Sequence, residues 1–198
     1  MSATRSTALI GLTLSLSACV SLGSKPPALL LNLTPAQMVA ANQTRSITTG
    51  EAISIAVPVA PQALATNRIA VTDGPVAIAY VKDVAWVEPP ARLFQRLVSE
   101  SVAAKTGRVV LDPRQFSLDS GTQITGQLRA FGMDAATSQA VIIYDAALSR
   151  DKGKRVETRR FEARLTVGVI DGRSSGNALN QAANKVADEV AEWVAGLR

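Results

Sequence analysis

The middle of the chain reads Trp86-Val87-Glu88-Pro89-Pro90-Ala91-Arg92-Leu93-Phe94-Gln95-Arg96-Leu97. Two adjacent prolines suit the first turn of a helix, where backbone N–H groups have no intrahelical acceptor. Gly107 is suited to a left-handed cap at the other end. We therefore predict a helix that opens within residues 86–90, runs to about Thr106 and buries one face. The predicted buried stripe comprises Leu93, Phe94, Leu97, Val98 and Val102.

Strand patterns lie on both sides of this helix. Alternating apolar residues predict strands at residues 51–59, 68–72 and 76–80 before it, after a short apolar strand at residues 29–33. Residues 109–111 follow it, and a meander is expected at residues 123–130, 139–148 and 156–170, with a charged turn at residues 150–154. The positions predicted to face the core include Ile53, Ile55, Val57, Val59, Ile124, Leu128, Ala130, Phe161, Ala163, Leu165, Val167 and Val169.

A second amphipathic helix is predicted from about Ser174 to the end of the chain. Its apolar face includes Val186, Val190 and Trp193, and we expect Trp193 to be buried against the sheet. The opposite face is acidic, which disfavours contact with anionic lipid. The sequence therefore predicts an α/β fold, a mixed sheet with the long helices packed on it in a single domain.

The N-terminal segment has the layout of an export signal. Arg5 precedes a short apolar run that ends in Leu16-Ser17-Ala18-Cys19, and this run is too short to span a bilayer. The ending resembles the lipobox of bacterial lipoproteins, in which the cysteine carries lipid; an ordinary secreted protein with a cysteine near the cleavage site is the alternative. We predict a signal peptide at residues 1–18, a lipidated Cys19 with a spacer to residue 28, and the domain at residues 29–198.

The residue after the cysteine bears on localisation. In the best-known sorting scheme for lipoproteins an Asp at this place retains the protein at the inner membrane, whereas the chain has Val20. The expected localisation is therefore the outer membrane, facing the periplasm, with the inner membrane as the alternative.

The composition excludes several kinds of active site. The chain has no histidine and one cysteine, so a Ser-His-Asp triad, a Cys-His pair and histidine ligation of zinc are impossible. No Gly-rich phosphate loop is present. We expect no cofactor, no metal site and no enzymatic activity. The net charge of +5 comes without interleaved aromatic residues, which argues against nucleic acid as a partner.

The lipobox, the early strands ending at Tyr80, the Trp86–Leu97 segment and the meander closed by a helix together resemble the ABC-type transport auxiliary lipoprotein family. Its members include the lipoprotein partner of the paraquat-inducible proteins. The resemblance implies a three-layer α/β domain similar to the anticodon-binding fold. It also implies an ABC permease, its ATPase and a substrate-binding protein with a mammalian-cell-entry domain as partners, in a system that moves lipids between two membranes.

The same segment supplies the candidate interaction surface, which comprises Trp86, Glu88 and Pro89, because exposed aromatic residues anchor interfaces. The alternative is that Trp86 packs in the core and Glu88-Pro89 only starts the helix. The function expected first is docking within a lipid transport complex. A structural or envelope-assembly lipoprotein and a periplasmic lipid carrier remain alternatives, and self-association into a homo-oligomer is left open.

Overall fold

The main sheet is organised around β7 in the computed structural model, which describes residues 26–48, 50–113 and 121–197. β7 pairs antiparallel with β8, and β8 with β9. Its other edge pairs in parallel with β2 near its start and with β3 near its end. The strands are β1 (Leu29–Leu31), β2 (Ile53–Ile55), β3 (Ala70–Asp73), β4 (Ala77–Tyr80), β5 (Val84–Trp86), β6 (Val110–Leu111), β7 (Thr122–Asp134), β8 (Gln139–Arg150) and β9 (Arg155–Thr166); the helices are α1 (Pro90–Thr106) and α2 (Gly172–Ala195), with single 3-10 turns η1 (Gln62–Leu64) and η2 (Asp151–Gly153).

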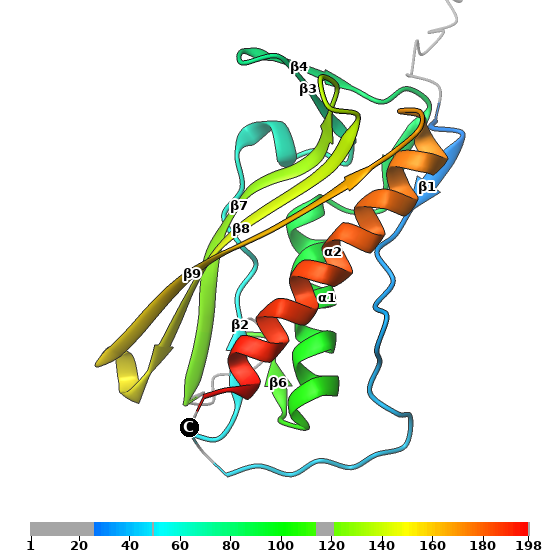
Figure 1. The fold of residues 1–198 in the computed structure, drawn as a ribbon. Helices are drawn as coiled ribbons and strands as arrows, with labels where there is room; N and C mark the ends of the chain where they lie inside the picture. The colour runs from blue at the N-terminus through cyan, green and yellow to red at the C-terminus, as the bar shows by residue number, and fades with distance from the viewer. Residues whose placement is uncertain (1–25, 49, 114–120, 198) are drawn as a thin grey trace, which may run out of the picture.

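Both long helices cover the same face of this sheet (Figure 1). α1 begins with Pro90 in its first turn and ends at Gly107, whose φ of 69° is the left-handed cap predicted from the sequence. In α2 the side chain of Asp171 accepts a hydrogen bond of 2.8 Å from the Ser174 amide, which caps the helix. The predicted α/β class, with two helices packed on a mixed sheet, is confirmed.

The helices are joined at their C-terminal ends by an ion pair. Lys105 of α1 lies 2.8 Å from Asp188 and 2.9 Å from Glu192 of α2. The two carboxylates accept its hydrogen bonds and raise the pKa of the Lys105 ammonium. Two acidic residues of α2 therefore pair with α1, and these ion pairs help to hold the two helices together.

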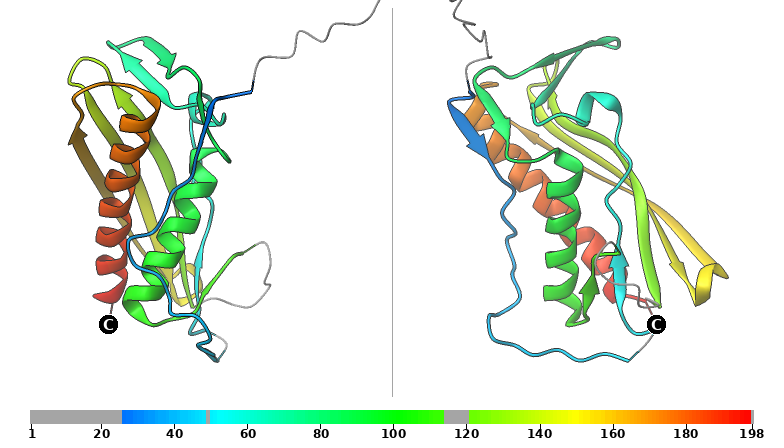
Figure 2. Two further views of the ribbon diagram at one scale, coloured as in Figure 1. Left: turned by 90° about the vertical axis from the view of Figure 1, so that its right-hand side faces the viewer. Right: turned by 180° about the vertical axis from the view of Figure 1, so that it is seen from behind.

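A third layer lies over the helices on the side away from the sheet (Figure 2). It consists of the parallel pair β1–β5 and of residues 32–39, which we call the strap. The Thr34 and Ala36 amides donate to the side chains of Asn180 and Asn184 on α2, at 2.9 and 2.7 Å. The Val39 amide donates to Glu100 on α1 at 2.6 Å. The strap is thus fixed to both helices by hydrogen bonds from its backbone.

The core contains a chain of aromatic rings that links four elements. Trp86 of β5 packs edge-on to Phe131 of β7, with 5.6 Å between ring centroids. Phe131 contacts Phe94 of α1, and Phe94 lies 5.1 Å from Tyr144 of β8. All four side chains are buried, and burial raises the pKa of the Tyr144 hydroxyl. These four aromatic rings hold α1 and β5 against the sheet.

Several strand details differ from the sequence predictions. Val59 and Val169, predicted to face the core, are 70% and 57% exposed, because β2 ends at Ile55 and β9 at Thr166. A β-bulge between Leu128 and Ala130 shifts the register, so that Phe131, in place of Ala130, faces the core. The strand β5 was not predicted. The remaining predicted strands are confirmed, with changed ends.

Candidate functional site

The pocket of interest opens where the edge of β7 is left without a partner strand. Ile55 of β2 pairs with Ile124, Val59 bridges to Gln127, and pairing resumes only where Ala70 of β3 meets Gly132. Between these points the chain leaves the sheet and forms η1. The interruption leaves a hollow of about 450 Å³ beside residues 129–131. This volume is within the roughly 300–1,000 Å³ typical of ligand pockets.

A row of residues in register across four strands forms the floor of the pocket. Ala70 pairs with Gly132, Gly132 with Val141, and Val141 with Arg164. Gly132 lets β3 approach β7 closely at this place, because a Cβ there would collide with the Ala70 carbonyl oxygen. The row lies on the sheet face opposite the helices.

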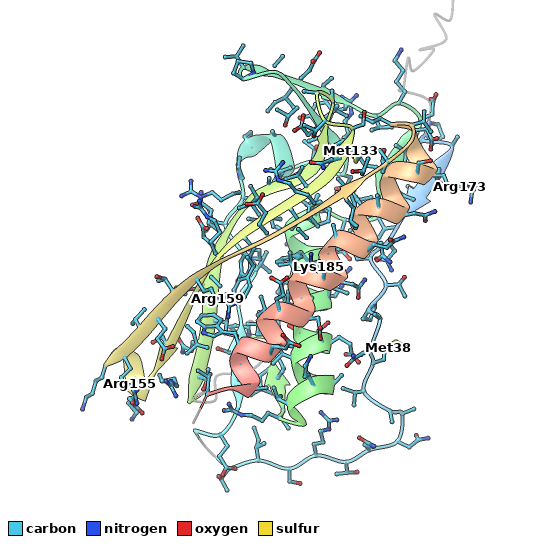
Figure 3. The ribbon with its side chains drawn as sticks, in the orientation of Figure 1. Met38, Met133, Arg155, Arg159, Arg173 and Lys185 are labelled. Atoms are coloured by element: carbon cyan, nitrogen blue, oxygen red, sulfur yellow. The ribbon has the colours of Figure 1, made fainter. Side chains whose placement is uncertain are left out.

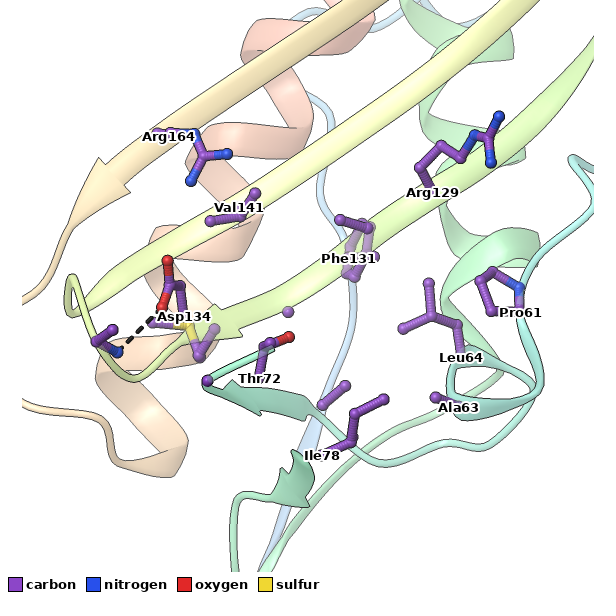
Figure 4. A pocket seen from close by; sticks show the side chains of 16 residues that line it. Pro61, Ala63, Leu64, Thr72, Ile78, Arg129, Phe131, Asp134, Val141 and Arg164 are labelled. Atoms are coloured by element: carbon purple, nitrogen blue, oxygen red, sulfur yellow. Dashed lines mark hydrogen bonds between the residues drawn. The ribbon is translucent and has the colours of Figure 1, made fainter. Parts of the chain in front are cut away.

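The pocket is mostly apolar, with charged groups at its rim (Figure 4). Pro61 and Leu64 lie at one end, and Asp134 and Arg164 lie at the other. Ile78 of β4 borders it and is 53% exposed. The remaining lining residues are Ala63, Ala70, Thr72, Gly74, Arg129, Ala130, Phe131, Gly132, Met133, Ala136 and Val141.

The charges at the rim are partly matched. Asp134 accepts hydrogen bonds from the Thr137 hydroxyl at 2.9 Å and from the Ala136 amide at 3.0 Å; these bonds, with the nearby Arg164 charge, lower the pKa of Asp134. Arg164 uses its Nε to donate to Glu162 at 2.6 Å. Its two Nη groups make no hydrogen bond within the described residues, so they are available to an anion.

A second cluster of charges lies next to the pocket on the same face. Arg129 and Arg160 both donate to Asp145, at 2.9 Å and at 2.6 and 2.8 Å. The hydrogen bond from Arg160, followed by that from Arg129, lowers the pKa of Asp145 well below its usual range. One carboxylate shared by two guanidinium groups leaves a local excess of positive charge.

This arrangement is suited to holding a ligand by apolar contact and one anionic group. The lining has a single hydroxyl, on Thr72, and a single carboxyl, on Asp134. Among the described residues, no cluster of three or more metal-ligating side chains is present. The sequence did not reveal the pocket, because its floor depends on the register of four strands and no local motif encodes that register.

The predicted interaction surface of Trp86, Glu88 and Pro89 is wrong for Trp86, which is not on the surface. Trp86 is 1% exposed, because β5 places its indole in the aromatic chain of the core, as the alternative interpretation held. Glu88 and Pro89 are partly exposed, and Glu88 pairs with Arg96 at 2.7 Å. A surface at this place would therefore rest on Glu88 and Pro89 alone.

The predicted lipid-bearing Cys19 and the signal peptide at residues 1–18 lie outside the described residues. The part of the chain that is described contains no helix of the length and apolarity needed to cross a bilayer. The described domain begins at Pro26, in the predicted spacer.

Comparison with known proteins gives a family and a fold. The family model of the ABC-type transport auxiliary lipoprotein component matches residues 31–191. Among solved structures, the chain is similar to an uncharacterized protein, with a TM-score of 0.67, 14% identity, and coverage of 84% of this chain and 97% of that one. It is also similar to protein XCC0632 from Xanthomonas campestris, of family DUF330, with a TM-score of 0.62, 20% identity, and coverage of 86% and 93%. At these identities the likeness concerns the fold alone. No curated protein matches the chain.

Proposed function

The chain belongs to the family of ABC-type transport auxiliary lipoprotein components, and we propose that it docks and supports a system that moves lipids between two membranes. The proposed partners are an ABC permease, its ATPase and a substrate-binding protein with a mammalian-cell-entry domain. The observation that carries this proposal is the family match over residues 31–191. The predicted lipobox at Leu16–Cys19 is consistent with it.

The proposal assigns the protein no catalytic step. The chain has no histidine, and the pocket lining has no cysteine, serine or lysine. Such a protein acts by holding a molecule or a partner at a membrane. Two acyl chains, at roughly 0.8 kcal/mol per buried methylene, are sufficient for stable anchoring. We propose anchoring through Cys19 at the outer membrane, with the domain in the periplasm.

The test is complementation of a deletion strain with Cys19→Ala, exported by an ordinary signal peptide. Cys19 precedes the described domain, so we expect the variant to fold and to be released from the membrane. We expect an envelope barrier defect, scored as sensitivity to detergents and apolar antibiotics, as severe as that of the deletion. Full rescue by the unanchored domain would reject the docking function.

Co-purification separates this function from that of a structural envelope lipoprotein. The wild-type protein, solubilised in mild detergent, should retain the permease, the ATPase and the cell-entry-domain protein. Recovery of the anchored protein without any of the three would favour the structural alternative.

A lipid carrier is the second candidate function, and the pocket favours it. The hollow of about 450 Å³ is mainly apolar, and at its rim lie the Nη groups of Arg164, which make no hydrogen bond to the part of the chain that is described. A carrier keeps its pocket when the anchor is removed. Rescue by the Cys19→Ala domain would therefore move this function to first place.

A further inference from the structure

Four exposed aliphatic side chains lie at the end of the domain where the described chain begins. Val76 is 93% exposed, Leu30 60%, Val169 57% and Ile78 53%. Val76 is the last residue of the β3–β4 turn, in which Gly74 has a φ of 71°, and the hairpin projects from this end (Figure 1). We call these four residues the apolar tip.

The segments that carry the apolar tip are tied into one end of the molecule. The Leu29 amide donates to the Asp83 carbonyl at 3.2 Å, which joins β1 to the segment after β4. The Ala135 amide donates to the Thr72 carbonyl at 2.9 Å, which joins the β7–β8 turn to β3. The Val167 amide donates to the Ser138 carbonyl at 2.8 Å, which joins the β7–β8 turn to the segment before α2. The apolar tip is therefore held by backbone hydrogen bonds.

The position of Pro26 shows which end of the domain lies near the predicted lipid anchor at Cys19. Pro26 lies seven positions after Cys19, and seven residues reach at most about 25 Å when fully extended. The 24 residues of α2 span about 36 Å and run from this end towards the other. With lipid on Cys19, the apolar tip stays near the bilayer, whereas the far end approaches it only when the domain lies flat.

We propose that the apolar tip is a second membrane contact, in which the β3–β4 hairpin inserts Val76 and Ile78 into the interfacial region of the bilayer. This inference rests on the lipid attachment of the proposed function. Charges around the hairpin are balanced, since Lys82 and Arg68 accompany Asp73 and Asp83, and Arg68 is stacked on Tyr80. The contact is thus apolar, and it does not depend on anionic lipid.

The experiment places a fluorescent probe at each end of the lipidated protein in phosphatidylcholine vesicles that contain spin-labelled lipid. Val76→Cys puts a maleimide probe on the apolar tip. Arg155→Cys is the matched control, because Arg155 is exposed at the far end of the β8–β9 hairpin (Figure 3). Acylated Cys19 does not react with maleimide. Both side chains are exposed, so both variants should keep the far-ultraviolet dichroism of the wild type.

We expect strong quenching of the probe at position 76, weak quenching at position 155, and the same pattern when anionic lipid is added. Equal quenching at both positions, or none at position 76, would overturn the membrane contact and favour a protein partner for the apolar tip. Incorporation of the probe into the wild-type chain would show that Cys19 is free. That result would refute the anchor itself, and the inference with it.

Discussion

Strands β7, β8 and β9 carry two different surfaces on alternate residues of the same segments. On the helix side, Phe131, Tyr144 and Phe161 are each 1% exposed and pack against α1 or α2. On the opposite side, their neighbours in sequence include Gly132, Asp145 and Arg160, which form a pocket floor and a solvent-facing ion cluster. The first surface is closed by the helices, whereas the second is covered only locally, by η1 and the β3–β4 hairpin.

The residues that stabilise the fold and the residues that are free to bind a ligand thus lie on opposite faces of one sheet. Burial of large side chains dominates folding energetics, and exposed ion pairs contribute about 0–1 kcal/mol each. Substitutions on the helix side should therefore change the free energy of unfolding strongly. Substitutions on the opposite side can change ligands or partners at small cost to the fold.

The largest effect is expected at Trp86. Trp86→Ala removes a fully buried ring from the aromatic chain, and we expect it to lower the free energy of unfolding by about 3–5 kcal/mol. Urea denaturation of the purified domain measures the change. A loss below 1 kcal/mol would mean that the indole is not part of the core.

Trp86→Phe is the matched control for this substitution. The indole Nε1 is buried and has no hydrogen-bond partner among the described residues, and an unpaired buried donor costs about 1–3 kcal/mol. Phenylalanine removes that donor and keeps an aromatic ring beside Phe131. We therefore expect Trp86→Phe to recover most of the stability lost in Trp86→Ala.

An intermediate effect is expected at Trp193, where the helix layer reaches its edge. Its ring contacts Phe161 of β9 at 5.6 Å between centroids, so it packs against the sheet as predicted, but its burial is only partial. Because part of the indole stays in solvent, its burial is worth less than that of the fully buried Trp86 ring, about 2 kcal/mol. Trp193→Ala should lower the unfolding free energy by that amount, and an effect as large as that of Trp86→Ala would contradict it.

The elements of the fold could be predicted where the signal was local. Two prolines and Gly107 set the limits of α1, and Asp73-Gly74-Pro75 set the β3–β4 turn. The side of the sheet that a residue faces depends on register, which a one-residue bulge reverses, as it does after Leu128. Trp86 was ambiguous because the same ring suits a core and an interface. The pocket could not be predicted, because its floor is assembled from strands far apart in the sequence.

The smallest effect is expected on the open face, at Asp145. Its hydrogen bonds from Arg160 and Arg129 hold its folded-state pKa below its usual value, whereas the unfolded value is about 3.9. The carboxylate therefore stabilises the fold above about pH 4, and this contribution is lost as the pH falls towards the folded-state pKa.

Because both arginines are largely exposed, we expect Asp145→Asn to lower the unfolding free energy at pH 7 by under about 1 kcal/mol. The difference from wild type should shrink as the pH is lowered below 4. Urea denaturation at pH 7 and at pH 3 measures both values. Glu162→Gln is the control, because within the described residues Glu162 forms an ion pair with one arginine, Arg164, and its effect should be smaller. A loss at Asp145 that equals that of Trp86→Ala would show that the ion cluster stabilises the fold as much as the helix side does, and the separation of the two surfaces would fail.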